Sequence, residues 1–420
     1  MSMDLTIPGI CFITSSIQLK FNTDGCATCL EPSPPRRIDA GHILVLSRLQ
    51  AQQHRMTEIP SISLFDSLPI PDGLTVPEIY DGTQDLHGKK VLILMLNGWG
   101  DLILIQPAIR ALYRVAESTG EPPRITLGCN WIRNFPYPDA EYVERIIPNI
   151  LTLAQLRSFD VLVNLLPVNH QRTATRSMRD LCLDILHLGP GSGGNDPPEI
   201  HPDPERLSRV RPVLERIRRK TGKRLLYLNW KSRFPHKNAP PSLLFQVADR
   251  LQDTCQAVVL KDGDVSTVMQ QEIDAFEAPI MNLSHLIHDY HDTVAALSLV
   301  DAFVSVDTGI VHAAGAMGIP GVALFGPFPP ETHVADYPSV VPVRAGFRGK
   351  VCDGPCLETH RGCAEVGYSP DAISPCFEAI DAGDVLAALE ASMHRRTGDA
   401  RAAASPGNRT EMMSPETRRT

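Results

Sequence analysis

Short apolar runs alternate with amphipathic stretches from residue 89 onward, and this alternation predicts repeated strand–helix units. Seven runs are too short for helices and indicate buried strands: 91–96, 124–127, 161–165, 225–228, 257–260, 302–306 and 321–325. Near-continuous apolar runs of this kind are typical of parallel strands covered on both faces. Helical spacing of apolar residues predicts helices at 102–119, 203–220, 242–251, 293–299 and 310–317. The chain is therefore expected to belong to the α/β class.

The strand–helix pattern occurs twice, which predicts two Rossmann-like domains facing a central cleft. We assign residues 86–220 to the first domain and 221–394 to the second. Residues 1–85 hold only two short apolar runs between loops that contain proline, and they predict a small β-rich appendage. Residues 395–420 are rich in Ala, Ser, Arg and Pro without periodicity, which predicts a disordered tail.

Charge and composition narrow the class of protein. With 40 basic and 48 acidic residues the net charge is −8, which argues against a general nucleic-acid binder. No apolar run approaches the roughly 20 residues of a membrane span. The first residues lack the basic start and cleavage site of a signal peptide, so we expect a cytoplasmic protein. Ten cysteines in a reducing compartment favour a metal site over a disulfide framework.

The most informative stretch joins two of the predicted strands, between residues 300 and 330. The strand at 302–306 ends in the polar turn Asp307-Thr308-Gly309, and a small, apolar helix follows. In open α/β sheets ligands bind at the carboxyl ends of the strands, and the N–H groups at a helix N-terminus attract anions. This turn is therefore a candidate anion site, although a buried turn with a packed His312 would show the same local pattern.

Residues 307–327 read DTGxxHxAxAxGxPxxxLFGP, which resembles the donor-site signature of glycosyltransferase family 9. This family comprises the ADP-heptose:lipopolysaccharide heptosyltransferases and their relatives. Gly100-Asp101 and the motif Pro-Ala-Ile-Arg-Ala-Leu at 107–112 resemble the family's opening unit. The resemblance spans residues 89–392. It implies the GT-B fold and inverting transfer of a sugar from a nucleotide-diphosphate sugar, expected to be ADP-heptose.

The resemblance also implies roles for individual residues. Asp101 corresponds to the family's proposed general base, although an aspartate there is also a common helix cap. Lys237 corresponds to a lysine that reaches the donor phosphates or the transferred sugar. The remaining donor-binding candidates are Ser232, Asp264, Asp307, Thr308, Gly309 and His312. We expect no cofactor for catalysis, so that cations and helix N-termini stabilise the leaving phosphate.

Four cysteines lie close together near the end of the second domain, within residues 350–377, here called the cysteine segment. They are Cys352, Cys356, Cys363 and Cys376. Four thiols in a loop rich in Gly and Pro predict a tetrahedral Zn or Fe site, whereas the alternative is reduced thiols that fill a loop. Some family 9 enzymes carry a comparable segment, and the branch that heptosylates autotransporter proteins uses such cysteines for iron.

The sequence does not identify the acceptor. The family resemblance implies lipopolysaccharide core, a related glycan or a lipid-linked glycan, with peripheral contact at the inner face of the membrane. The appendage and the cysteine segment resemble the autotransporter-modifying branch, which implies a protein acceptor and allows an oligomer. A sugar-nucleotide epimerase of the same fold would need further carboxylates that we do not locate. A binding subunit without catalysis would not need Asp101 together with Lys237.

Overall fold

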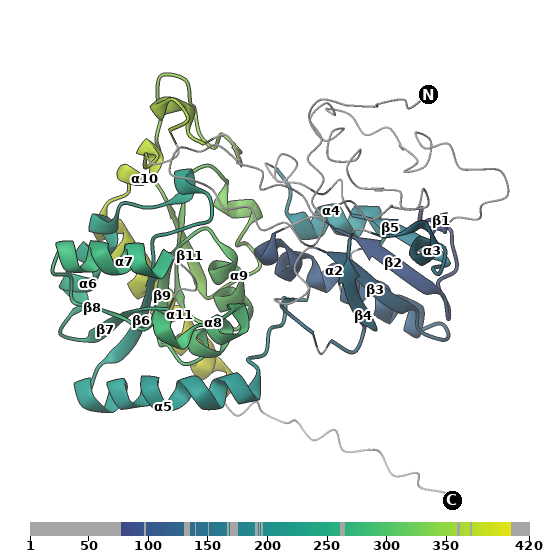
Figure 1. Ribbon diagram of the computed structural model, residues 1–420, viewed down its shortest axis with the longest axis horizontal. Helices are drawn as coiled ribbons and strands as arrows, with labels where there is room; N and C mark the ends of the chain where they lie inside the picture. The colour runs from purple at the N-terminus through teal and green to yellow at the C-terminus, as the bar shows by residue number, and fades with distance from the viewer. Residues whose placement is uncertain are drawn as a thin grey trace, which may run out of the picture.

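The computed structural model describes residues 77–404, with short gaps at 96–97, 130–134, 139, 150, 166–167, 169–174, 190–191, 193, 195, 261–264, 359–361 and 370–371. Two parallel sheets form the centres of two α/β halves, which lie side by side (Figure 1). The α/β class and the two Rossmann-like halves predicted from the sequence are confirmed. Of the predicted appendage, only residues 77–85 are described, and they add a short strand to the first sheet.

The N-terminal half is built on a five-stranded parallel sheet in the order β1-β5-β2-β3-β4. The strands are β1 (Glu78–Ile79), β2 (Lys90–Leu94), β3 (Arg124–Cys129), β4 (Arg145–Pro148) and β5 (Val161–Asn164). Its helices are α2 (Trp99–Glu117), α3 (Leu153–Leu156) and α4 (Met178–Ile185). Helix α2 follows β2 directly, as the predicted strand–turn–helix unit requires.

The C-terminal half contains a six-stranded parallel sheet in the order β11-β10-β9-β6-β7-β8. The strands are β6 (Arg224–Asn229), β7 (Cys255–Val259), β8 (Ile280–Asn282), β9 (Ala302–Val306), β10 (Gly321–Phe325) and β11 (Val340–Arg344). The helices are α5 (Pro204–Thr221), α6 (Pro241–Leu251), α7 (Val265–Ala275), α8 (Tyr290–Leu297), α9 (Gly309–Ala316), α10 (Pro375–Glu378) and α11 (Ala382–Ala404). Four 3₁₀ turns complete it: η2 (Pro235–Lys237), η3 (Ser284–Leu286), η4 (Pro330–Thr332) and η5 (Ala364–Val366).

Alternating residues of β6 enter two different cores, because successive side chains of a strand point to opposite faces. Leu225 and Tyr227 belong to the core that includes helices α8 and α9, whereas Leu226 and Leu228 pack with α6 and α11. All four side chains are at most 1% exposed. Burial on both faces explains why the sequence shows this strand as a continuous apolar run.

Helix α5 packs with the C-terminal half, although the domain limits assigned from the sequence placed it in the first half. It lies against α8, and Arg206 pairs at 2.8 Å with Asp292, whose side chain is fully buried. Arg218 likewise pairs with Asp301 at 2.8 Å, ahead of β9. These buried and half-buried partners hold the helix in place, so the packing puts the boundary before α5.

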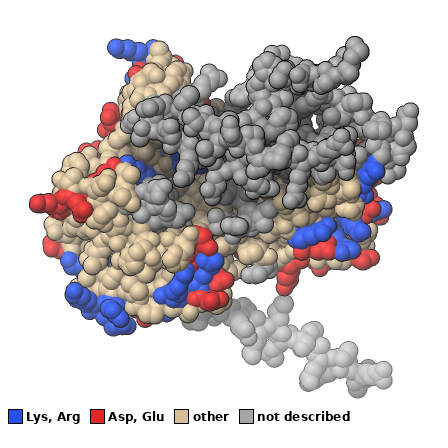
Figure 2. Space-filling model, in the orientation of Figure 1, with Lys and Arg blue, Asp and Glu red and all other residues tan. Residues whose placement is uncertain are grey.

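Basic and acidic side chains intermix along the lower edge of this half (Figure 2).

Helix α11 returns across the C-terminal sheet and extends further than the sequence pattern predicted. It continues to Ala404, ten residues into the segment for which we predicted disorder. Ala and Arg, which dominate that stretch, are strong helix formers even without an apolar stripe. Residues 405–420 lie outside the described part of the chain. Among the described helices, none has the length and apolar character needed to cross a membrane.

Candidate functional site

The candidate site lies at the carboxyl ends of β6 and β9, the two central strands of the C-terminal sheet. The chain continues from β6 to β7 and β8 on one side, then returns to β9, β10 and β11 on the other. The loops after β6 and β9 therefore diverge, and in open α/β sheets ligands bind in the crevice that results. The two strand ends are joined by a hydrogen bond of 3.0 Å from Asn229 Nδ2 to Ser305 Oγ, with both residues fully buried.

Lys237 and Asp307 form a buried ion pair at this edge of the sheet. Lys237 Nζ lies 2.7 Å from Asp307 Oδ2, and the two side chains are 11% and 4% exposed. Burial alone would raise the pKa of Asp307, but the Lys237 ammonium, aided by His333 and His312, holds it below its usual value. Lys237 Nζ also lies 5.0 Å from the centre of the Phe328 ring. The structure thus brings together two residues that the sequence analysis selected as donor-site candidates.

His312 is the second buried group beside Asp307. Its Nε2 atom lies 4.0 Å from Asp307 Oδ1, and its side chain is 4% exposed. Burial lowers the pKa of His312 to about 4 although the Asp307 charge acts in the opposite direction. The ring is therefore neutral at pH 7. Among the described residues, its Nδ1 atom is buried and has no hydrogen-bond partner.

His333 is a member of this cluster that the sequence analysis missed. It is 4% exposed, packs on Phe328, and acts electrostatically on both Asp307 and His312. Its Nδ1 atom lies 3.0 Å from the carbonyl oxygen of Pro329. Its only sequence signal is its position in the loop after β10, and a histidine in a Pro-rich loop does not by itself indicate a site.

Thr308 and Gly309 start helix α9, as predicted. Thr308 is the N-cap residue in extended conformation, with its hydroxyl 3.5 Å from Ser305 Oγ. A side chain at Gly309 would overlap the ring of Trp99 from helix α2. Glycine here lets the two halves approach. The N–H groups of the first helical turn have no carbonyl partner within the helix, so they can donate hydrogen bonds to an anion.

Asp101 reaches the site from the opposite half. It is the third residue of α2, and Gly98 N donates a hydrogen bond of 2.7 Å to Asp101 Oδ2. The sequence allowed it to be the N-cap itself, but Gly98 occupies that position and Asp101 completes the capping box from N3. Asp101 is 7% exposed, and its charge acts on His312 across the contact between α2 and α9.

Two donor candidates remain, Ser232 and Asp264. Ser232 stabilises its own loop: its hydroxyl accepts a hydrogen bond of 3.3 Å from Phe234 N, and its backbone N–H donates to Asn238 Oδ1 at 2.7 Å. Both bonds fix the loop that carries Lys237. Asp264 lies outside the described residues.

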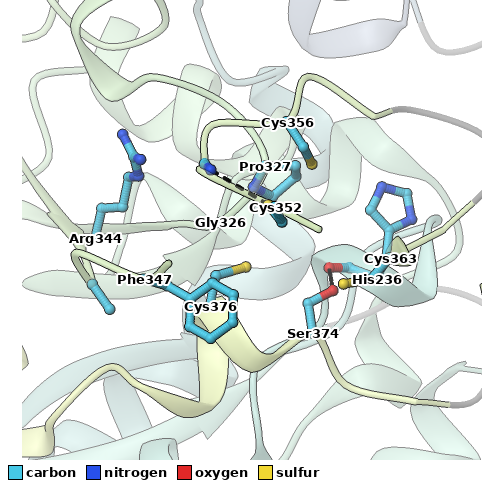
Figure 3. Close-up of a pocket in the computed structure, with 12 residues that line it drawn as sticks. His236, Gly326, Pro327, Arg344, Phe347, Cys352, Cys356, Cys363, Ser374 and Cys376 are labelled. Atoms are coloured by element: carbon cyan, nitrogen blue, oxygen red, sulfur yellow. Dashed lines mark hydrogen bonds between the residues drawn. The ribbon is translucent and has the colours of Figure 1, made fainter. Parts of the chain in front are cut away.

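The four cysteines predicted as metal ligands line one pocket beside this loop (Figure 3). The cavity measures about 20 Å³, room for a single water-sized group. Burial, with the neighbouring thiols, raises the pKa of Cys376 to about 12. Within the described residues, no three His, Cys, Asp or Glu side chains already stand in a metal-ligating arrangement. The thiols thus share a cavity of suitable size and would have to move closer to coordinate an ion.

Comparisons with known proteins give a family match over part of the chain and similar solved structures. Residues 210–350 match glycosyltransferase family 9 (heptosyltransferase), a range that includes Lys237, Asp307 and His312 but not Asp101 or the cysteines. A search of curated protein sequences found no match.

One solved structure with a TM-score above 0.5 shows the same fold at low sequence identity. A glycosyltransferase of family 9 from Veillonella parvula is 17% identical, with a TM-score of 0.54 over 74% of this chain and 99% of its own. The E. coli ADP-heptose lipopolysaccharide heptosyltransferase II is 15% identical, with a TM-score of 0.49 over 73% and 99% of the two chains. The iron-containing dodecameric glycosyltransferase TibC of enterotoxigenic E. coli is 15% identical, with 0.49 over 75% and 78%.

Proposed function

We propose that the protein is a glycosyltransferase of family 9 that transfers heptose from ADP-heptose with inversion to a lipopolysaccharide-core or related glycan. The family match over residues 210–350 supports this proposal. The observation that carries the proposal is the buried pair of Lys237 and Asp307 at the switch point of the C-terminal sheet. The pair lies beside the N-terminus of α9, with Asp101 held across the contact between the halves.

The donor pyrophosphate is proposed to bind between Lys237 and the first turn of α9. An ammonium has three N–H donors, so Lys237 can keep its bond of 2.7 Å to Asp307 while donating to a phosphate oxygen. The N–H groups of Thr308 and Gly309 and the Thr308 hydroxyl supply further donors. The neutral His312 ring has one N–H group that can donate to a phosphate oxygen. These groups stabilise the negative charge that develops on the leaving diphosphate.

Asp101 is proposed as the general base from the other half. Its carboxylate accepts the proton of the acceptor hydroxyl as that oxygen attacks the anomeric carbon. The bond from this carbon to the phosphate oxygen breaks in the same step, and the nucleoside diphosphate departs with the electron pair. A single displacement inverts the anomeric centre, so one base is sufficient.

The donor and the base are tested together by comparing the wild-type protein with an Asp101→Asn variant. We expect ADP-heptose to raise the melting temperature of both, because Asp101 does not bind the diphosphate. Turnover should fall by about 10²–10⁴-fold in the variant, the usual contribution of a general base. GDP- and UDP-linked sugars serve as matched donor controls. Absence of any shift with nucleotide sugars would refute the donor site, and equal turnover would refute the base.

A protein acceptor of the autotransporter type is the second candidate, and the cysteine pocket is the observation that favours it. The two acceptors are distinguished by supplying the active enzyme and ADP-heptose with either truncated lipopolysaccharide or an autotransporter passenger domain. Heptose incorporation into only one of them decides the acceptor class. Donor binding without incorporation into either would indicate a binding subunit without catalysis.

The four cysteines are proposed to hold one structural Zn or Fe ion. Four thiolates are a preferred donor set for either metal, and the loop needs to contract around the cavity to bring them to bonding distance. Thiols whose pKa is raised, such as Cys376, release their protons on binding, so the affinity should increase with pH. The catalytic steps above do not depend on this ion.

Metal content measured by elemental analysis on the purified chain tests this proposal without reference to activity. We expect about one equivalent of Zn or Fe in the wild-type protein. A Cys376→Ser variant should lose it, whereas Cys182→Ser, which alters a buried cysteine of the other half, should retain it. A wild-type protein free of both metals after metal-supplemented expression would leave the cysteines as reduced thiols that fill a loop.

A further inference from the structure

His236 and Lys237 are neighbours in the 3₁₀ turn η2, yet their side chains contact different parts of the molecule. Lys237 meets Asp307 and the Phe328 ring in the candidate donor site. His236 is 5% exposed and lines the cysteine pocket, with its Nε2 atom 2.9 Å from the carbonyl oxygen of Glu358 (Figure 3). Because a carbonyl only accepts, the histidine donates from Nε2.

A second hydrogen bond joins the same turn to the cysteine segment. The His236 carbonyl oxygen accepts from Ser374 Oγ at 2.7 Å, and both residues are buried. Ser374 is the N-cap of α10, the short helix that contains Cys376. The turn is thus held from two points of the cysteine segment, Glu358 and Ser374. Each lies within two residues of a cysteine that lines the pocket, Cys356 or Cys376.

The cysteine segment also supports the other side of the lysine. Leu357 N donates a hydrogen bond of 2.9 Å to the carbonyl oxygen of Pro327, the residue before Phe328. A side chain at Gly326 would overlap the Phe377 ring, so the segment packs directly on the backbone there. Both the turn beneath Lys237 and the ring beside its ammonium therefore rest on the cysteine segment.

We propose that His236 is a positioning residue that transmits the conformation of the cysteine segment to Lys237 and so sets the affinity for a nucleoside diphosphate. A single 3₁₀ turn has few internal hydrogen bonds of poor geometry, and lysine has a long, flexible side chain. The bonds within the loop at Ser232 fix its start, and the bonds from the cysteine segment add a second support that keeps the ammonium in its phosphate-binding position. His236 touches no substrate in this account, and the inference rests on the proposed donor function.

The test measures ADP binding by calorimetry for wild type, His236→Ala and His236→Gln, each repeated in a Lys237→Met background. His236→Ala should weaken ADP binding by about tenfold, the scale of one buried hydrogen bond. His236→Gln, whose amide can donate to the Glu358 carbonyl, should stay within about twofold of wild type. In the Lys237→Met background the His236→Ala change should have no further effect on ADP binding, because His236 is proposed to act on ADP only through Lys237.

A merely structural role gives a different result. In that case His236→Ala weakens binding by the same factor in both backgrounds, and this additivity overturns the inference, as does wild-type affinity in His236→Ala. If His236→Ala does not fold, Ser374→Ala removes the other bond to the turn and should weaken ADP binding by about threefold. Wild-type affinity in a folded Ser374→Ala variant would then overturn the inference. If the wild-type protein does not bind ADP, the donor function itself is refuted. If Lys237→Met loses ADP binding but His236→Ala does not, only the role of His236 is refuted.

Discussion

Replacing Lys237 by methionine should destabilise the protein strongly, because it leaves the Asp307 charge buried without its partner. Asp307 is 4% exposed and Lys237 11%, so water screens the pair little. Removing one member of a buried ion pair costs about 3–5 kcal/mol. Lys237→Met together with Asp307→Asn removes both charges and should recover most of that loss. The coupling free energy of the pair in a double-mutant cycle should therefore be about 2–3 kcal/mol.

The loss should also depend on pH. In the wild-type protein the pKa of Asp307 is lowered, so its contribution to stability is present above the unfolded pKa of about 3.9 and is lost as pH falls through the folded pKa. Without Lys237, burial raises the folded pKa, and the folded variant takes up a proton before the wild type does. The difference in stability between the two proteins should therefore shrink from pH 7 toward pH 4.

Urea unfolding followed by tryptophan fluorescence measures these changes, since Trp230 is fully buried in the same half. Lys231→Met is the matched control: its partner Glu272 is 23% exposed and keeps a hydrogen bond of 2.6 Å from Trp230 Nε1. We expect the control to cost about 1 kcal/mol or less. The reasoning is refuted if Lys237→Met costs no more than the control, or if the losses from the two single changes simply add.

Two other changes test the surroundings of this pair. In the wild-type protein the pKa of His312 is about 4, whereas the ordinary value of 6.5 applies to the unfolded chain. Between pH 6.5 and pH 4 the unfolded chain therefore binds a proton at His312 that the folded protein does not bind. Stability should therefore fall by up to about 3 kcal/mol from pH 6.5 to pH 4. The His312→Gln variant should lack this part of the fall in stability, and the difference between its urea midpoints at pH 7 and pH 4.5 measures the effect. A difference as large as that of the wild-type protein would contradict the prediction. Gly100→Ala should cost about 1–3 kcal/mol because its methyl group would overlap His312, whereas Gly189→Ala, in open space, is the control. Equal melting temperatures for the two alanine variants would show that the halves do not meet as described.

Local sequence patterns were sufficient to predict the secondary structure of the central elements. The predicted strands at 302–306 and 321–325 coincide with β9 and β10, because buried parallel strands are apolar throughout and polar or glycine-containing turns end them. The same local signals placed Thr308 and Gly309 at the start of α9. Helix α5 was also predicted from periodicity, but periodicity does not state which half a helix packs against. Its position depends on ion pairs with α8 and the residue before β9.

The contacts among these residues depend on the tertiary fold. Lys237 and Asp307 are 70 positions apart, and they pair because β6 and β9 are neighbours at the point where the strand order reverses. The sequence around His333 and His236 did not indicate a site, since their roles arise from residues that the fold brings close to them. Local sequence sets the conformation of each segment through backbone and side-chain preferences. Burial, pKa shifts and ion pairs depend on distances across the fold, which no single segment specifies.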